Sequence, residues 1–191
     1  MEKLGIRWGF IHILCMFTLV FCNRKIQEKS DDLTLNSFIK EIGSFDSLGN
    51  KTGLWIGYYN NKTVAYKGNY LKGLKDSIWV YYNIDGDIDK IERFEIGRKN
   101  GLTKIYSKGN LYDEINYKND VKDGKHTHYY TTSNKINFLQ EYRNDTLHGE
   151  FKLFFENGKL KQHGAFKNGR NIGEWLTFSE RGEIIERIFY E

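Results

Sequence analysis

Histidine is the side chain with metal-binding or acid–base chemistry that gathers most closely in this 191-residue chain. His126, His128, His148 and His163 fall within one stretch, and the first two are two residues apart. On a β-strand these two side chains share a face, about 7 Å apart. Zinc needs a third and a fourth ligand, normally Cys, His, Asp or Glu, and the spacing does not clearly bring His148 to the pair. We therefore predict no metal site and no cofactor.

Carboxylates offer a second kind of chemistry, because two that face each other can act as general acid and base. The candidates are Glu141, Glu150, Glu156 and Glu174. Walker loops and HExxH and CxxC motifs do not occur in the sequence. An active site also needs a pocket. These glutamates could therefore be catalytic only if the elements that carry them enclose one.

A period of about 24 residues organises the chain from Gly53 onward and decides how these side chains are placed. The repeats start at Gly53, Ser77, Gly101, Gly124, Gly149 and Gly173. Two residues after each start the chain has Trp55, Trp79, Thr103, His126, Phe151 and Trp175. Five residues after each start it has Tyr58, Tyr82, Tyr106, Tyr129, Phe154 and Phe178. Recurrence at fixed offsets indicates that these aromatic residues are structural.

Each repeat predicts a β-hairpin, because runs rich in aromatic and β-branched residues favour strands. The Gly and Asn residues between the runs suit tight turns, and we interpret the periodic glycines as turn residues. One hairpin is marginal in water, so the hairpins must lie side by side. The sequence predicts an all-β fold, an elongated single-layer antiparallel sheet of about six 24-residue hairpin repeats. This repeat domain spans residues 44–191, with a half-repeat at 44–52. An open sheet encloses no pocket, and we predict that the protein is not an enzyme.

The pattern G-x-W-x-x-Y, a Gly turn, then an aromatic residue followed by Asn-Gly and a further Gly, resembles the MORN repeat. The repeat length is similar to that of the bacterial MORN-repeat variant. The resemblance covers residues 53–191 and departs from the pattern at Ser77, Thr103, Asp120, His126 and Asp145. It implies a scaffold role, lipid binding in some members, and an antitoxin label for some bacterial ones.

Residues 1–22 differ from the repeats in composition. Lys3 and Arg7 form a basic start, and an apolar run leads from Trp8 to Cys22. The run is short for a membrane-spanning helix and is typical of a secretory signal peptide. Its end, Leu-Val-Phe-Cys, resembles a bacterial lipobox, which predicts that the Cys22 thiol is lipidated. The alternatives are an ordinary signal peptide and a short uncleaved anchor.

Residues 23–43 are predicted to be a tether and a short cap. Leu35, Phe38, Ile39 and Ile42 recur at the spacing of one helical face, and Gly43 suits the end of that helix. Such a helix would cover the first edge of the sheet. A second interpretation is that the cap is itself a degenerate half-repeat, as is common at the ends of repeat arrays.

The formal net charge is +4, with basic and acidic residues interspersed. Nucleic-acid-binding proteins usually cluster their basic residues on one face, so we predict no nucleic-acid partner. The leading hypothesis is a non-enzymatic binding or scaffold module at the cell envelope, with a protein partner and a membrane attachment through the N-terminal segment. Alternatives are a secreted or periplasmic protein and an antitoxin that neutralises a partner toxin. The export-like start argues against the antitoxin, which would be cytoplasmic.

The predicted binding site lies where the repeat departs from its pattern. Thr103 and His126 replace tryptophan, and His128 and Tyr130 are expected on the same face, beside Ile105. Together they would form a mixed polar and aromatic patch, which suits protein contact. The alternative is sequence drift in a tolerant repeat.

Overall fold

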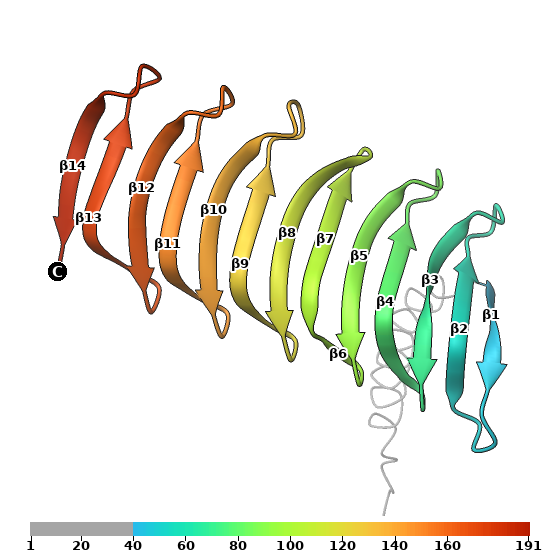
Figure 1. Cartoon of the computed structure of the whole chain (residues 1–191). Helices are drawn as coiled ribbons and strands as arrows, with labels where there is room; N and C mark the ends of the chain where they lie inside the picture. Colours follow the sequence, from blue (N-terminus) through green and yellow to red (C-terminus); the bar gives the residue numbers. More distant parts are fainter. Residues whose placement is uncertain (1–39) are drawn as a thin grey trace, which may run out of the picture. The chain divides into compact units, whose positions relative to one another are not determined.

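The computed structural model describes residues 40–191. The predicted signal peptide, Cys22 and the tether up to residue 39 lie outside the described residues. Residues 40–191 form one antiparallel sheet in which the long strands are neighbours in the order in which they occur along the chain (Figure 1). This part of the chain contains no helix, and hence none able to cross a membrane. The predicted all-β, single-layer fold is confirmed.

The sheet has 14 strands, and each predicted repeat supplies one hairpin. The short strand β6 pairs with β5, and Asn100 separates it from β7. The bounds are β1 Lys40–Phe45, β2 Lys51–Tyr58, β3 Val64–Leu71, β4 Leu74–Tyr82, β5 Ile88–Glu95, β6 Arg98–Lys99, β7 Gly101–Ser107, β8 Asn110–Lys118, β9 Val121–Tyr129, β10 Ile136–Arg143, β11 Thr146–Phe154, β12 Leu160–Lys167, β13 Arg170–Phe178 and β14 Ile184–Tyr190.

The start of the sheet differs from the predicted helical cap. Residues 40–45 form β1, which pairs with β2 and places Ile42 opposite Ile56. The helix predicted to end at Gly43 is therefore wrong for residues 40–43, which belong to the half-repeat predicted to begin at residue 44. A short isolated helix is marginal, whereas pairing with β2 satisfies one edge of the β1 backbone and covers the first tryptophan.

The interpretation of the periodic glycines as turn residues is wrong for the repeat starts, because the first residue of each repeat lies in a strand. All six residues at this position have a positive φ, including the one serine, Ser77, at 60°. At this point the ladder to the strand before usually shifts register, as it does between β3 and β4. A residue in the left-handed region lets a strand bulge and bend, and glycine adopts that conformation most readily. The bends give the strands of Figure 1 their curvature.

The two faces of the sheet carry different rows of side chains. We call the face that holds Trp55, Trp79 and Trp175 the tryptophan face. Their rings are almost fully buried although the sheet has one layer, and Trp79 is only 1% exposed. The other, opposite face carries the tyrosine row predicted from the sequence, each member paired with an aliphatic residue of the same hairpin, as Tyr82 is with Ile88.

Each tryptophan ring lies on a glycine of the preceding strand. A Cβ added to Gly43, Gly68 or Gly164 would stand 2.2 Å from the ring of Trp55, Trp79 or Trp175, respectively. Two of the indole N–H groups also donate hydrogen bonds to that strand, at 3.1 Å to the carbonyl of residue 44 and 3.0 Å to that of residue 69. The glycine is therefore required by the close approach of the ring.

Where the tryptophan is missing, the glycine is missing too. The strand register places Ile115 opposite His126 and Gln140 opposite Phe151. The same register places Glu92 beside Thr103. Where a side chain smaller than tryptophan stands on one strand, a side chain larger than glycine stands opposite it on the strand before. The space on the tryptophan face is therefore filled in every repeat.

Candidate functional site

The departures of the third and fourth repeats gather around one carboxylate. His126 Nε2 lies 2.7 Å and His128 Nδ1 lies 2.9 Å from the same oxygen of Asp113, Oδ1. The amide of Gln140 lies 3.1 Å from His126 Nδ1 and donates to the hydroxyl of Tyr142 at 3.0 Å. We call Asp113, His126, His128, Gln140 and Tyr142 the histidine cluster. With both His126 nitrogens engaged, the neutral ring donates to the aspartate and accepts from the glutamine.

Aromatic packing fixes the position of the two imidazoles. The His128 ring stacks on Phe138 with centroids 4.8 Å apart and an angle of 11° between the planes. Tyr112 meets the other side of this histidine edge-on at 4.4 Å. His126 meets Phe138 edge-on at 5.2 Å. The histidines therefore take the place of the tryptophan and its aromatic neighbours in the other repeats.

Burial controls the charge of the cluster. His126 is 8% exposed, and burial lowers its pKa, while the hydrogen bond to Asp113 raises it and offsets that effect only in part. Lys122 and His128 lower it further by repulsion. The net pKa of His126 lies below the usual 6.5, so the folded protein favours the neutral ring.

We expect the protein to lose stability as the pH falls below about 6.5. A base with a lowered pKa in the folded state is protonated more readily in the unfolded state, so its contribution is complete above pH 6.5 and declines below it. Urea midpoints across this range should show the loss. His126→Gln should flatten the dependence, whereas His163→Gln, which changes a half-buried ring outside the cluster, should keep it. The same pH dependence in wild type and His126→Gln would contradict the assignment.

The structure does not bring the four predicted binding residues together on one exposed surface. Thr103 is 3% exposed and His126 is buried in the cluster, whereas His128 is half-buried. Tyr130 lies after the end of β9 and donates its hydroxyl to the carbonyl of Phe154 at 2.8 Å. Tyr59, at the same repeat position, does likewise to the next repeat at 2.7 Å. Tyr130 is thus placed as a link between repeats.

Several of the remaining candidate groups are engaged with oppositely charged or hydroxyl partners, whereas His148 Nδ1 is buried without a hydrogen-bond partner among residues 40–191. His163 Nε2 lies 3.1 Å from Glu150, which also accepts from Lys152 at 2.7 Å. Glu174 pairs with Arg187 and Glu156 accepts from Thr132. Within residues 40–191, no three His, Cys, Asp or Glu side chains are arranged to hold a metal ion.

Comparison with known families adds one finding. The family model for the MORN repeat variant matches residues 51–72 and 147–168. These segments cover the hairpins of the first and the fifth repeat, β2–β3 and β11–β12, and each ends one residue after its second strand. The chain is a MORN-repeat protein. No curated protein matches its sequence.

The MORN array holds a second buried charge that the sequence analysis missed. Glu92, 2% exposed, lies on the tryptophan face with Oε1 2.9 Å from Lys99 Nζ and 3.3 Å from Lys90 Nζ. Burial raises the pKa of Glu92, but its contacts with Lys99 and Lys90 outweigh that effect and leave the pKa below its usual value. The signal in the sequence was a glutamate at the row position where Gly68 and Gly164 stand.

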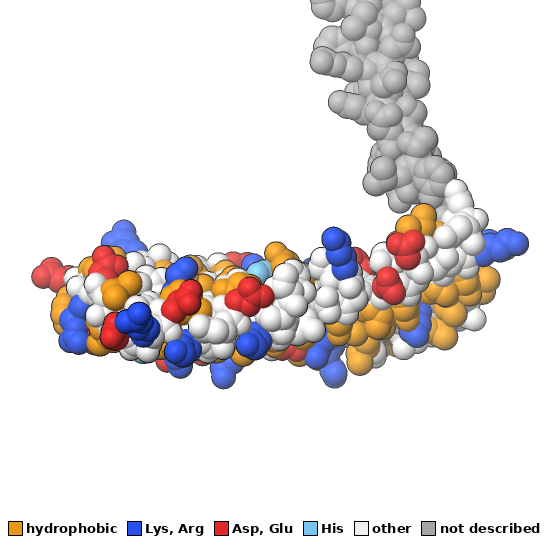
Figure 2. Space-filling view, turned by 90° about the horizontal axis from the view of Figure 1, so that it is seen from above, with side chains coloured by type: hydrophobic (Ala, Val, Ile, Leu, Met, Phe, Trp, Pro, Cys, Tyr) orange, Lys and Arg blue, Asp and Glu red, His pale blue; other side chains and the backbone are white. Residues whose placement is uncertain are grey.

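The opposite face of the first three MORN repeats carries exposed apolar side chains in register. One residue after each repeat start, Leu54 is 55%, Ile78 is 53% and Leu102 is 37% exposed. The same position in the last three repeats has Lys125, Glu150 and Glu174. Figure 2 shows hydrophobic side chains gathered on one side of the sheet near the end that carries β1. We call this surface the apolar strip, and it consists of Leu54, Ile56, Ile78, Val80, Ile91 and Leu102.

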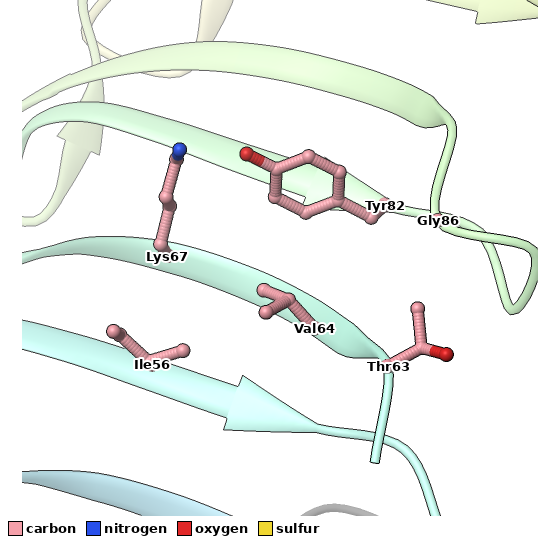
Figure 3. A pocket seen from close by; sticks show the side chains of 6 residues that line it. All are labelled: Ile56, Thr63, Val64, Lys67, Tyr82 and Gly86. Atoms are coloured by element: carbon pink, nitrogen blue, oxygen red, sulfur yellow. The ribbon is translucent and has the colours of Figure 1, made fainter. Parts of the chain in front are cut away.

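A shallow hollow of about 460 Å³ adjoins the apolar strip. Ile56, Val64 and Tyr82 line it from β2, β3 and β4, and Lys67 stands beside them on the same side of the sheet (Figure 3). The ammonium group of Lys67 lies 5.5 Å from the centre of the Tyr82 ring. The hollow therefore combines apolar walls with one positive charge.

Proposed function

We propose that this MORN-repeat protein is a non-enzymatic binding or scaffold module that holds a partner protein on the surface of its sheet. The observation that carries the proposal is the apolar strip, because a row of exposed apolar side chains in register over three repeats is unusual on a surface without a partner. MORN repeats are associated with binding and scaffold roles, which supports the same conclusion.

The polar groups of the sheet favour a structural over a catalytic role. The histidine cluster satisfies its own hydrogen bonds, and Glu92 is neutralised by two lysines. General acid–base catalysis needs a group within hydrogen-bond reach of a bound substrate. His126 and Glu92 lie among their partners in the tryptophan row, whereas the exposed row on the opposite face is apolar.

We further propose that the protein acts at the cell envelope, attached to the membrane by a lipid on Cys22. The support is the basic and apolar N-terminal sequence that ends in Leu-Val-Phe-Cys. A secreted or periplasmic form would follow from cleavage without lipidation. A membrane anchor would hold the sheet near partners that reside in or on the same membrane.

Cys22→Ala is expected to release the protein from the membrane fraction, because the thiol is the acceptor of the lipid. The measurement is fractionation of cells that express the tagged full chain, with mass analysis of its N-terminus. A variant that stays in the membrane with residues 1–22 intact would show an anchor segment instead.

Capture of partners from detergent-solubilised membranes tests the function itself. The tagged full chain should recover one protein in near-equal amount after cross-linking in cells. Recovery of no protein at all would contradict a protein-binding role. A cytoplasmic toxin recovered with a chain that retains residues 1–22 would replace the envelope proposal with the antitoxin.

A further inference from the structure

We propose that the apolar strip binds an acidic amphipathic α-helix of the partner, which lies across β2 to β7 along the direction of the array. This inference rests on the proposed function and adds to it a surface and the chemistry of the partner. It places the contact on the opposite face and not on the histidine cluster.

The extent of the strip limits the contact to the first three repeats. Leu54, Ile78 and Leu102 occupy one repeat position on β2, β4 and β7, and Ile56 and Val80 lie two residues further along their strands. In the fourth repeat the row continues with the exposed Lys125. A partner that covers apolar side chains would therefore end its contact near β8.

The backbone of the sheet favours a helical partner. Every strand from β2 to β5 is paired on both sides, so the strip offers side chains and no free strand edge. An extended peptide laid on these side chains would leave its own N–H and C=O groups without partners, which is costly. A helix satisfies those groups internally, and helices commonly cover one face of an antiparallel sheet.

The spacing of the strip matches the heptad of an amphipathic helix. Leu54, Ile78 and Leu102 recur every second strand, which corresponds to about 9.6 Å across the sheet. Seven residues of an α-helix rise about 10.5 Å. The mismatch is about 1 Å per repeat, so each of three successive heptads can place an apolar anchor beside one of these side chains.

The charges around the strip favour an acidic partner. Lys67 lies between Ile56 and Val80 in the cross-strand row, and Lys104 lies next to Ile91. Lys104 is paired with Glu114 at 2.9 Å, whereas Lys67 makes no ion pair within residues 40–191. Arg93 flanks the row beside Ile78. Carboxylates on the edges of the bound helix would meet these groups.

The test measures binding of synthetic helical peptides to the full chain. The probe is a peptide of three heptads with leucine on one face and glutamate beside that face, and the comparison peptide has lysine in place of glutamate. We expect the acidic peptide to bind about tenfold more tightly than the basic one. Fluorescence anisotropy of labelled peptides gives both affinities.

Three variants locate the contact. The triple change Leu54→Ser, Ile78→Ser and Leu102→Ser should weaken the acidic peptide by about tenfold or more, and Lys67→Glu should reduce the preference for it. The matched control changes Lys125, Glu150 and Glu174, at the same repeat position, to Ser and should bind as wild type does. Circular dichroism verifies that each variant is folded.

Several results would overturn the inference. One is unchanged binding of the acidic peptide to the triple serine variant, and another is equal binding of the two peptides. A third is a wild-type dimer that the triple change converts to a monomer, because a second copy of the chain would then cover the strip. If the membrane partner is captured equally by wild type and triple variant, the helix site is wrong while the binding function stands. If wild type captures no protein, the proposed function is wrong. The peptide affinities still test separately whether the apolar strip binds a helix.

Discussion

Trp79→Ala is expected to destabilise the sheet by about 3–5 kcal/mol, the range found when a buried tryptophan is truncated. The Trp79 ring is 1% exposed, meets Tyr70 edge-on at 4.9 Å, and has the ammonium group of Lys75 4.4 Å from its centre. Its N–H is bonded to the preceding strand. Truncation removes these contacts at a point where β3, β4 and β5 meet. Urea denaturation of the purified chain gives the free energy of unfolding.

Two comparisons make this experiment specific. Trp175→Ala should cost less, because Trp175 packs beside β14, whose residues are all exposed, and an end of the array can fray alone. Leu54→Ala removes an exposed side chain and should change stability by about 0.5 kcal/mol or less. If Trp79→Ala were no more harmful than Leu54→Ala, the tryptophan row would not be the core of the sheet.

Gly68→Ile is also expected to destabilise the sheet, because a Cβ at this position falls 2.2 Å from the Trp79 ring. Overpacking of this kind costs about 1–3 kcal/mol and sometimes more. The protein has a native solution to the same conflict in Ile115 and His126, which stand opposite each other on equivalent strands. The double variant Gly68→Ile with Trp79→His copies that pair and should be more stable than the sum of its single changes predicts, by about 1–3 kcal/mol.

The double-mutant cycle needs a control on the same strand. Asn69→Ile adds the same side chain one residue away, on the opposite face, where Asn69 is exposed. Combined with Trp79→His it should be additive to within about 0.5 kcal/mol. Additive free energies in both cycles would mean that the side chains at positions 68 and 79 do not depend on each other's size.

The sequence predicted the hairpins well because the repeat is a local signal. Aromatic residues at fixed offsets assign strands without knowledge of the fold, and the structure has a strand at each predicted run. The helix predicted to end at Gly43 was wrong for residues 40–43 because it rested on a local pattern alone. It was judged on its own spacing, whereas β1 is stabilised by its neighbour β2.

The candidate site was less predictable because its partners come from different strands. His126 and His128 were expected on one face, but Asp113 on the strand before and Gln140 on the strand after could not be assigned without the register. That register depends on bulges, and one residue of error moves every side chain of a strand to the other face. The positive φ of the repeat starts, which produces the bulges, cannot be inferred from the period alone.

The pairing of each tryptophan with a glycine of the strand before has a consequence for how such an array can grow. The interlocking partners, such as Gly68 and Trp79, belong to two successive hairpins. Duplicating the hairpin of β4 and β5 would therefore bring Glu92 under the copied Trp79, and duplicating that of β13 and β14 would bring Ile188 under the copied Trp175. A segment that carries the second strand of one hairpin and the first strand of the next keeps its partners together. The segment that can be exchanged by recombination is thus shifted by half a repeat along the sequence relative to the β-hairpin.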